Sequence, residues 1–215
     1  MLHENTVEQQ TLEILKRLMQ DSLLDEFVLV GGTALSLMIG HRKSIDLDFF
    51  TKNQFDASTL REELRAKYRF EVDFFQMNTL KGTINDVAVD FLRHNYPDLE
   101  SQVIFDGIRM ASLRDIAAMK VNAILNSGSR IKDFIDVAYL GRYLTMNEMV
   151  SSYTQKYPGL NEMMILKALL YFDDVDYSTE IVLLGNNDFS FARIKSLIQK
   201  MINHPNETLQ NKDFN

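Results

Sequence analysis

Three aspartates stand in segments of this sequence that are otherwise apolar. Asp46 and Asp48 are separated by one leucine in SIDLDFF, and Asp90 lies in NDVAVDFLRH. Both segments alternate like β-strands, so Asp46 and Asp48 should project from one face, roughly 6 to 7 Å apart along the backbone. Carboxylates at that spacing repel each other unless a cation lies between them, and oxygen ligands suit divalent ions. Three carboxylates on two adjacent strands therefore predict a site for two Mg²⁺ ions, with Mn²⁺ as an alternative, that holds the oxygens of a phosphoryl transfer.

A pair of glycines precedes these aspartates. Gly31 and Gly32 follow the apolar run EFVLV and lead into TALSLMIG, a pattern typical of a strand, a tight turn and a helix that begins near Thr33. Glycines let backbone N–H groups approach a phosphate, and the start of a helix adds the positive end of its dipole. Arg42 and Ser44 flank the aspartate pair, and Arg42 would either meet a phosphate or neutralise the carboxylates.

Each of these features has a simpler interpretation. Two glycines after a strand often form only a turn, and an Asp-x-Asp pair is usually a solvated strand edge. The order of the features is more informative: an apolar strand, Gly-Gly-Thr, a helix, Asp-Leu-Asp on a second strand, and an isolated aspartate on a third. That order predicts a nucleotide site in which phosphates bridge the glycine turn and the metal ions.

The elements that must position these residues alternate between helix and strand up to about residue 110. Apolar residues at helical spacing predict a helix over residues 7–19, and DASTLREELRAKYR predicts another that opens at Asp56 or Ser58. FEVDFFQMNT and GTINDVAVDFLRHN predict two or three strands joined at Lys81 and Gly82.

From Ser112 the pattern changes to consecutive helices. SLRDIAAMKVNAILN begins with a Ser-x-x-Asp cap, further amphipathic segments follow, and a last helix is expected near residues 189–202. The expected fold class is α+β, a mixed sheet flanked by helices and followed by a C-terminal helical bundle. The expected domains are residues 1–111 with the sheet and an N-terminal helix, residues 112–203 with the helices that complete the site, and a flexible tail at 204–215.

Composition and missing motifs exclude several classes of protein. The 215 residues, 46 % hydrophobic and 25 % charged, are ordinary for a soluble globular protein, and the absence of cysteine excludes disulfides and thiolate metal sites. A formal charge of −7 argues against nucleic-acid binding by bulk electrostatics. No stretch reaches the roughly 18 apolar residues of a membrane helix and no targeting signal is present, so we expect a cytoplasmic protein without a membrane partner. The four histidines lie far apart, and neither a P-loop nor a Rossmann glycine motif occurs.

At the level of motifs, the sequence resembles a known family. GGTALSLMIGHRKSIDLDFF is similar to the signature of the AbiEii/AbiGii-type nucleotidyltransferase toxins of bacterial abortive-infection and toxin–antitoxin systems, within the polymerase-beta-like nucleotidyltransferase superfamily. VAVDF and KVNAILNSGSRIKDFIDVAYL continue the resemblance, which covers residues 30–140. Where the wider superfamily usually has Gly-Ser, this sequence has Gly-Gly-Thr, so Thr33 would supply the hydroxyl.

The resemblance implies a two-metal transfer of a nucleoside monophosphate from a nucleoside triphosphate to a hydroxyl, with pyrophosphate leaving. Asp46 and Asp48 match the metal-binding pair, and Asp90 matches the third carboxylate, near the attacking hydroxyl. Lys120 matches a lysine that meets the triphosphate, and Asp136 matches a later aspartate of the active site. The nucleotide-binding residues expected around them are Gly31, Gly32, Thr33, Arg42, Ser44, Arg130, Lys132 and Asp133.

The residues themselves leave alternatives open in the helical half. Lys132 and Asp136 are four apart and could pair on a helix surface, while Asp133 and Asp136 share a face with Arg130 nearby. The simpler interpretation is a surface ion-pair network. Lys120 stands among apolar residues, where a lysine usually extends its amine to water.

These features together predict a Mg²⁺-dependent nucleotidyltransferase that acts as a toxin in a toxin–antitoxin or phage-defence system. The expected substrates are a nucleoside triphosphate and tRNA or another RNA, and the expected protein partner is a cognate antitoxin. One alternative is an enzyme that modifies a protein hydroxyl by AMPylation. Another is a nucleotide-binding or antitoxin-binding module without turnover.

Overall fold

The chain divides into two compact units. A computed structural model describes residues 1–184 and 190–214. One unit contains Met1–Tyr96 and Gln102–Ala111, and the other contains Pro97–Ser101 and Ser112–Asn215. The strands lie in the first unit and a set of helices in the second, so the expected α+β class with C-terminal helices is confirmed.

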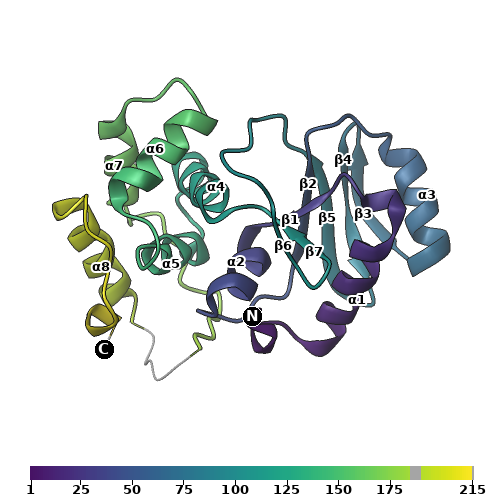
Figure 1. Cartoon of the computed structure of the whole chain (residues 1–215), viewed down its shortest axis with the longest axis horizontal. Coiled ribbons are helices and arrows are strands. Elements are labelled where there is room, and N and C mark those ends of the chain that lie inside the picture. Colours follow the sequence, from purple (N-terminus) through teal and green to yellow (C-terminus); the bar gives the residue numbers. More distant parts are fainter. Residues whose placement is uncertain (185–189, 215) are drawn as a thin grey trace. The chain divides into compact units, whose positions relative to one another are not determined.

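Within the residues that the structure describes, the first unit is built on a seven-stranded mixed sheet with the order β3-β4-β5-β2-β1-β7-β6 (Figure 1). The strands are β1 (Val28–Val30), β2 (Leu47–Thr51), β3 (Glu71–Gln76), β4 (Thr79–Ile84), β5 (Val87–Arg93), β6 (Val103–Phe105) and β7 (Ile108–Met110). β2 runs parallel to β5 and antiparallel to β1, and β4 is antiparallel to both β3 and β5. The pairing of β2 with β5 brings together the two segments that carry the predicted carboxylates.

Helices complete this unit. They are α1 (Gln9–Gln20), α2 (Gly31–Ile39) and α3 (Ala57–Tyr68), with 3₁₀ turns at Glu4–Thr6 and Ser22–Leu24. In the core of the unit, the rings of Phe49 on β2 and Phe91 on β5 stack with centroids 5.2 Å apart and are 1 % and 0 % exposed. Because successive side chains of a strand alternate, Asp48 and Asp90 point to the opposite face.

The joints between β3, β4 and β5 differ from the prediction. Lys81 and Gly82 lie inside β4, and the turns are two-residue loops at Met77–Asn78 and Asn85–Asp86. Three of these four loop residues have positive φ, between 47° and 64°. Asn and Asp adopt this left-handed conformation at low cost, and tight hairpin turns require it. The predicted turn at Gly82 was wrong. A glycine is needed at this position of the strand because a side chain there would collide with the ring of Phe70.

Helix α2 begins two residues earlier than predicted. The sequence pattern predicts a start near Thr33, whereas α2 begins at Gly31, directly after β1. Gly31 has a φ of +72°. The backbone N–H groups of this first turn have no acceptor within the helix, and no side chain of the N-cap residue Val30 caps them. The glycines therefore form the positive end of the helix rather than a loop before it.

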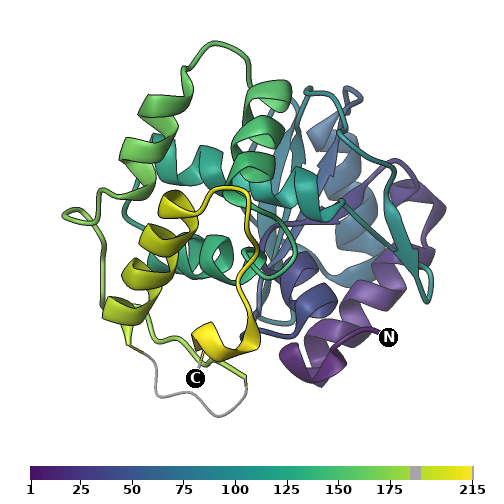
Figure 2. The same cartoon turned by 60° about the vertical axis from the view of Figure 1, so that its left-hand side comes forward.

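The second unit consists of helices (Figure 2). They are α4 (Leu113–Asn126), α5 (Ile131–Leu140), α6 (Met146–Lys156), α7 (Glu162–Leu169) and α8 (Phe191–Asn203), with a 3₁₀ turn at Asn211–Phe214. The predicted cap of α4 is confirmed, because Oγ of Ser112 accepts the N–H of Asp115 at 3.1 Å. The predicted last helix is α8, although Phe189 lies outside the described residues. No helix in the described part of the chain combines the length and the apolar character that a membrane crossing requires.

The segment after α8 is predicted from the sequence to be a flexible tail, but its described part turns back along this unit (Figure 2). The N–H of Leu209 donates to the carbonyl of Gly141 at 2.7 Å, and the Asp213 carboxylate pairs with Lys200 of α8 at 2.5 Å. Leu209 and Phe214 are 5 % and 3 % exposed. Two apolar side chains and one ion pair thus hold this segment in place.

Candidate active site

Asp48, Asp90 and Lys81 form a row across three neighbouring strands of the first unit. Asp48 on β2 is the register partner of Asp90 on β5, and Asp90 is the partner of Lys81 on β4. Partners in register point to the same face, so the three side chains lie side by side. The amine of Lys81 forms an ion pair with the carboxylate of Asp90, and the two side chains are 42 % and 22 % exposed. The row therefore joins two predicted carboxylates to a lysine, in a position open to solvent.

Asp46 lies just before β2 rather than within it. β2 begins at Leu47, and Asp46 is exposed. The hydroxyl of Thr33 donates to the carbonyl of Asp46 at 2.5 Å and lies 2.9 Å from Oγ of Ser44. Thr33 is 1 % exposed. Its hydroxyl therefore fixes the segment that presents Asp46, whereas the sequence led us to expect contact with a phosphate.

Each glycine of the turn leaves room for one charged side chain. A Cβ atom on Gly31 would lie 2.5 Å from Oδ2 of Asp48, and one on Gly32 would collide with the guanidinium of Arg42. Arg42 is 2 % exposed, and its Nη1 donates to the carbonyl of Lys43 at 2.9 Å. Asp48 thus lies against the first turn of α2 on one side, and Arg42 adds positive charge behind that turn.

The donor chemistry of this site fits a hard divalent cation. Asp48 and Asp90 are neighbouring carboxylates on two strands, Asp46 is an exposed third, and oxygen ligands of this kind are those that Mg²⁺ prefers. Among the described residues, no three such side chains are already gathered into one ligand group. The amine of Lys81 provides the positive charge beside Asp90, so a cation that binds Asp90 would displace it.

A second group of predicted residues lies in the helical unit and is buried. Nζ of Lys120 on α4 is 2.8 Å from Asp133 and 2.7 Å from Asp136, both on α5. The three residues are 5 %, 2 % and 0 % exposed. Nε of Arg130, at the start of α5, is 3.6 Å from Asp133. A buried cluster around Lys120 therefore replaces the surface network that the spacing of Lys132 and Asp136 suggested.

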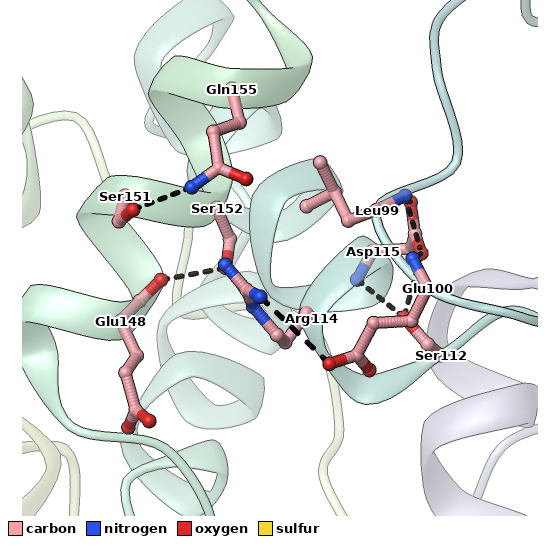
Figure 3. A network of polar contacts seen from close by, with 9 residues as sticks. All are labelled: Leu99, Glu100, Ser112, Arg114, Asp115, Glu148, Ser151, Ser152 and Gln155. Atoms are coloured by element: carbon pink, nitrogen blue, oxygen red, sulfur yellow. Dashed lines mark hydrogen bonds and ion pairs between the residues drawn. The ribbon is translucent and has the colours of Figure 1, made fainter.

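A third polar cluster surrounds Asp115, the acidic residue of the predicted Ser-x-x-Asp cap (Figure 3). Its carboxylate accepts hydrogen bonds from Oγ of Ser112 at 2.6 Å, the N–H of Leu99 at 3.1 Å and Nζ of Lys156 at 2.7 Å. Burial raises the pKa of this carboxyl, but the hydrogen bonds from Lys156, Ser112 and Leu99 and the charge of Lys156 together outweigh burial, so the pKa lies below its ordinary value of 3.8. The cluster fastens Pro97–Ser101 to the helical unit, to which that segment belongs.

Lys81 and Lys156 are the members of these clusters that sequence reasoning missed. For Lys81 the sequence does contain a signal, namely the asparagines at the two hairpin loops. Turns predicted at those loops would place Lys81 in the middle of a strand, opposite Asp90. For Lys156 no local signal exists, since its partner Asp115 lies 41 positions earlier in the chain.

Solved structures with this fold include nucleotidyltransferase-like proteins. An antigenic nucleotidyltransferase-like protein from Paracoccidioides brasiliensis is 18 % identical, with a TM-score of 0.50 over 76 % of this chain and 94 % of that chain. JHP933 from Helicobacter pylori is 16 % identical, with a TM-score of 0.55 over 92 % of each chain. The antibiotic-resistance factor ANT(2″)-Ia is 16 % identical, with a TM-score of 0.50 over 68 % of this chain and 91 % of that chain. The chain thus has the fold of the nucleotidyltransferases.

The family follows from comparison of the sequence. Residues 13–103 match the family model described as nucleotidyl transferase AbiEii toxin, type IV TA system. The protein aq_aa25 of Aquifex aeolicus (strain VF5), described as uncharacterized, is 33 % identical over 168 residues, which are 75 % of this chain and 81 % of that protein. The chain belongs to the AbiEii nucleotidyltransferase toxin family and is a nucleotidyltransferase, as its motifs predict.

Proposed function

We propose that the protein is a Mg²⁺-dependent toxin of a toxin–antitoxin or phage-defence system that transfers a nucleoside monophosphate from a nucleoside triphosphate to a hydroxyl of an RNA, with tRNA as the expected acceptor. The observation that carries the proposal is the row of Asp48, Asp90 and Lys81 beside the first turn of α2. Membership of the AbiEii family supports the type of reaction. A cognate antitoxin is the proposed protein partner, and the cytoplasm is the proposed location.

The triphosphate would bind at the N-terminal end of α2. Gly31 and Gly32 present backbone without side chains there, and the N–H groups of this turn have no acceptor within the helix. The guanidinium of Arg42 lies directly behind Gly32 and adds positive charge. Thr33 and Ser44 hold the segment that follows α2 against the turn, so phosphate site and carboxylates keep a fixed relation.

The carboxylates would act directly beside this turn, with Asp48 against Gly31 and Asp90 on the neighbouring strand. Asp46, Asp48 and Asp90 would hold the Mg²⁺ ions, which when bound would stabilise the charge on the attacking and leaving oxygens. Asp90 would accept the proton of the acceptor hydroxyl. The hydroxyl oxygen would then bond to the α-phosphorus while the bond from phosphorus to the leaving pyrophosphate breaks. Lys81 neutralises Asp90 before substrate enters, and its exposed amine can then turn toward a phosphate.

The charged residues of α4 and α5 enter the proposal through the family resemblance. Lys120 would meet the triphosphate and Asp136 would serve the active site, with Arg130, Lys132 and Asp133 assisting in nucleotide binding. Lys120 contacts two buried carboxylates, so its amine would have to exchange at least one of these contacts for a phosphate.

One labelling experiment tests the proposal. The protein is incubated with Mg²⁺ and each of the four α-labelled nucleoside triphosphates in turn, together with total RNA and total protein. We expect label from one triphosphate to enter the tRNA fraction. The Asp46→Ala/Asp48→Ala double variant should lose both this transfer and growth arrest. The control is Asp73→Ala, which removes an exposed aspartate of β3 and should leave both unchanged.

The outcomes separate the proposal from its alternatives. Full toxicity of the double variant would contradict the mechanism. Label in the protein fraction would instead identify an AMPylating enzyme. Tight binding of a triphosphate without release of pyrophosphate would identify a nucleotide-binding module without turnover.

A further inference from the structure

Three aromatic side chains form a stack on the sheet face that carries Asp48 and Asp90. Phe50 follows Asp48 by two residues in β2, so it points to the same face, roughly 6 to 7 Å along the strand. The N–H of His94, directly after β5, donates to the carbonyl of Thr51 at 2.8 Å. The rings of Phe50 and His94 are stacked, with centroids 4.9 Å apart and an interplanar angle of 25°. The ring of Tyr96 lies next to that of His94, with centroids 4.8 Å apart and a tilt of 47°.

This stack is distinct from the core of the unit. The core aromatics of the same strands, Phe49 and Phe91, lie on the opposite face and are 1 % and 0 % exposed. In the stack, Phe50 and His94 are half-buried and Tyr96 is 44 % exposed. The burial of apolar surface therefore does not account for the exposed ring of Tyr96 at the end of this group, whereas an open aromatic end of this kind suits a planar ligand.

We propose that Phe50, His94 and Tyr96 form a subsite on which a nucleobase of the RNA acceptor stacks. This inference rests on the proposed function, because it assigns the acceptor strand to a place next to the reacting groups. Aromatic side chains hold bases of single-stranded RNA in this manner, and the π-face of any base can be accepted.

The position of the stack favours the acceptor over the incoming triphosphate. In the sheet order β5-β2-β1, the glycine turn follows β1 on one side of Asp48, whereas Asp90 lies on β5 on the other side. His94 and Tyr96 continue the chain of β5, so they extend from the carboxylate proposed to meet the acceptor hydroxyl. Lys52 stands directly after β2, beside this end of β5, where a cation suits the phosphates of a polynucleotide despite the net charge of −7.

The absence of tryptophan from the chain allows a direct test. The Tyr96→Trp variant carries a single indole in the stack, and a base that stacks on it should quench its fluorescence. The probes are a short single-stranded RNA with a free 3′-hydroxyl, a fully abasic strand of the same length, and each nucleoside triphosphate alone. We expect saturable quenching by the RNA and none by the abasic strand. Quenching by triphosphate alone, or no quenching by RNA, would overturn the assignment.

A kinetic test uses variants that change or keep the ring. Tyr96→Ala should raise the KM for the RNA acceptor about 5- to 150-fold, the range that alanine substitution gives for one stacked base, and leave the KM for the triphosphate unchanged. Tyr96→Phe keeps the ring and should restore the wild-type KM. Tyr143→Ala is the matched control, since this tyrosine is similarly exposed, at 47 %, and lies in the helical unit. An equal change in both KM values would contradict the subsite.

Binding and turnover are read separately, so the two proposals can fail independently. Quenching of the Tyr96→Trp variant by RNA, in a protein that labels no RNA, would keep the subsite and overturn the transfer. Labelled RNA without quenching would keep the transfer and overturn the subsite.

Discussion

At Gly31 the backbone adopts a φ of +72°, and the missing side chain leaves room for the Asp48 carboxylate. Gly31→Ala would add a Cβ 2.5 Å from Oδ2 of Asp48 and would also place alanine in the left-handed region, which costs roughly 1–2 kcal/mol. We expect a drop of about 100-fold in transfer, because small displacements of a catalytic group cost that much. The measurement is label transferred per minute at saturating triphosphate.

The control for this variant is Gly107→Ala. Gly107, in the turn between β6 and β7, has a similar φ of +77°, but nothing lies within 4 Å of an added Cβ. It should lose roughly 1–2 kcal/mol of stability in urea unfolding and keep its transfer activity. Equal activity of the two variants would show that the contact of Gly31 with Asp48 does not matter for the reaction.

At the scale of elements, the strands could be predicted from local patterns more completely than their joints. The alternation of apolar residues located β2 and β5, and the order of motifs brought Asp48 and Asp90 to one site. The turns depend instead on residues that tolerate positive φ, such as Asn85 and Asp86. The prediction placed a turn at Gly82 instead, so it did not recognise Lys81 as a strand residue opposite Asp90. The contact of Thr33 with Asp46 needs the tertiary structure, because nothing in a linear pattern shows where a hydroxyl will point.

The contact between Asp115 on α4 and Lys156 on α6 predicts how the stability of the protein changes at acidic pH. The pKa of Asp115 is below its ordinary value of 3.8 in the folded protein, so the unfolded chain binds more protons just below that pH. Its stabilising contribution is therefore complete above 3.8 and is lost as the pH falls through the folded pKa. We expect urea unfolding curves of Asp115→Asn to depend less steeply on pH between about 4 and 3 than those of the wild type.

The same variant should be less stable at pH 7. Removing the Asp115 charge leaves Lys156, 1 % exposed, without its counter-charge, and breaking a buried pair costs about 3–5 kcal/mol. The double variant Asp115→Asn/Lys156→Met should recover part of this loss. Asp173→Asn, at an exposed position, is the control and should follow the wild type. An unchanged acid dependence in Asp115→Asn would place the acid-sensitive group elsewhere.

At the scale of the whole chain, the division between sheet and helices could be located near residue 111 because the hydrophobic period changes there. The sequence could not show that Pro97–Ser101 belongs to the helical unit. That placement depends on hydrogen bonds from backbone N–H groups of this segment to Asp115, which lies later in the chain. The C-terminal segment is a similar case. It is mostly polar, so its composition suggests a tail, but the positions of Leu209 and Phe214 decide its structure.

Deleting residues 205–215 should therefore lower the free energy of unfolding, which the removal of a flexible tail would leave unchanged. Burying a side chain such as Leu209 or Phe214 is worth about 1.5–3 kcal/mol each, so we expect urea unfolding to show a loss of about 3–6 kcal/mol. Gly141→Ala crowds the same region in the full chain, because its Cβ would lie 2.7 Å from Sδ of Met201 on α8 and 2.9 Å from Cδ1 of Leu209. It should lose stability in the same direction, whereas Lys212→Ala, at an exposed position, should not. If the deletion variant unfolds at the wild-type urea concentration, the segment contributes nothing to folding, and its buried contacts are incidental.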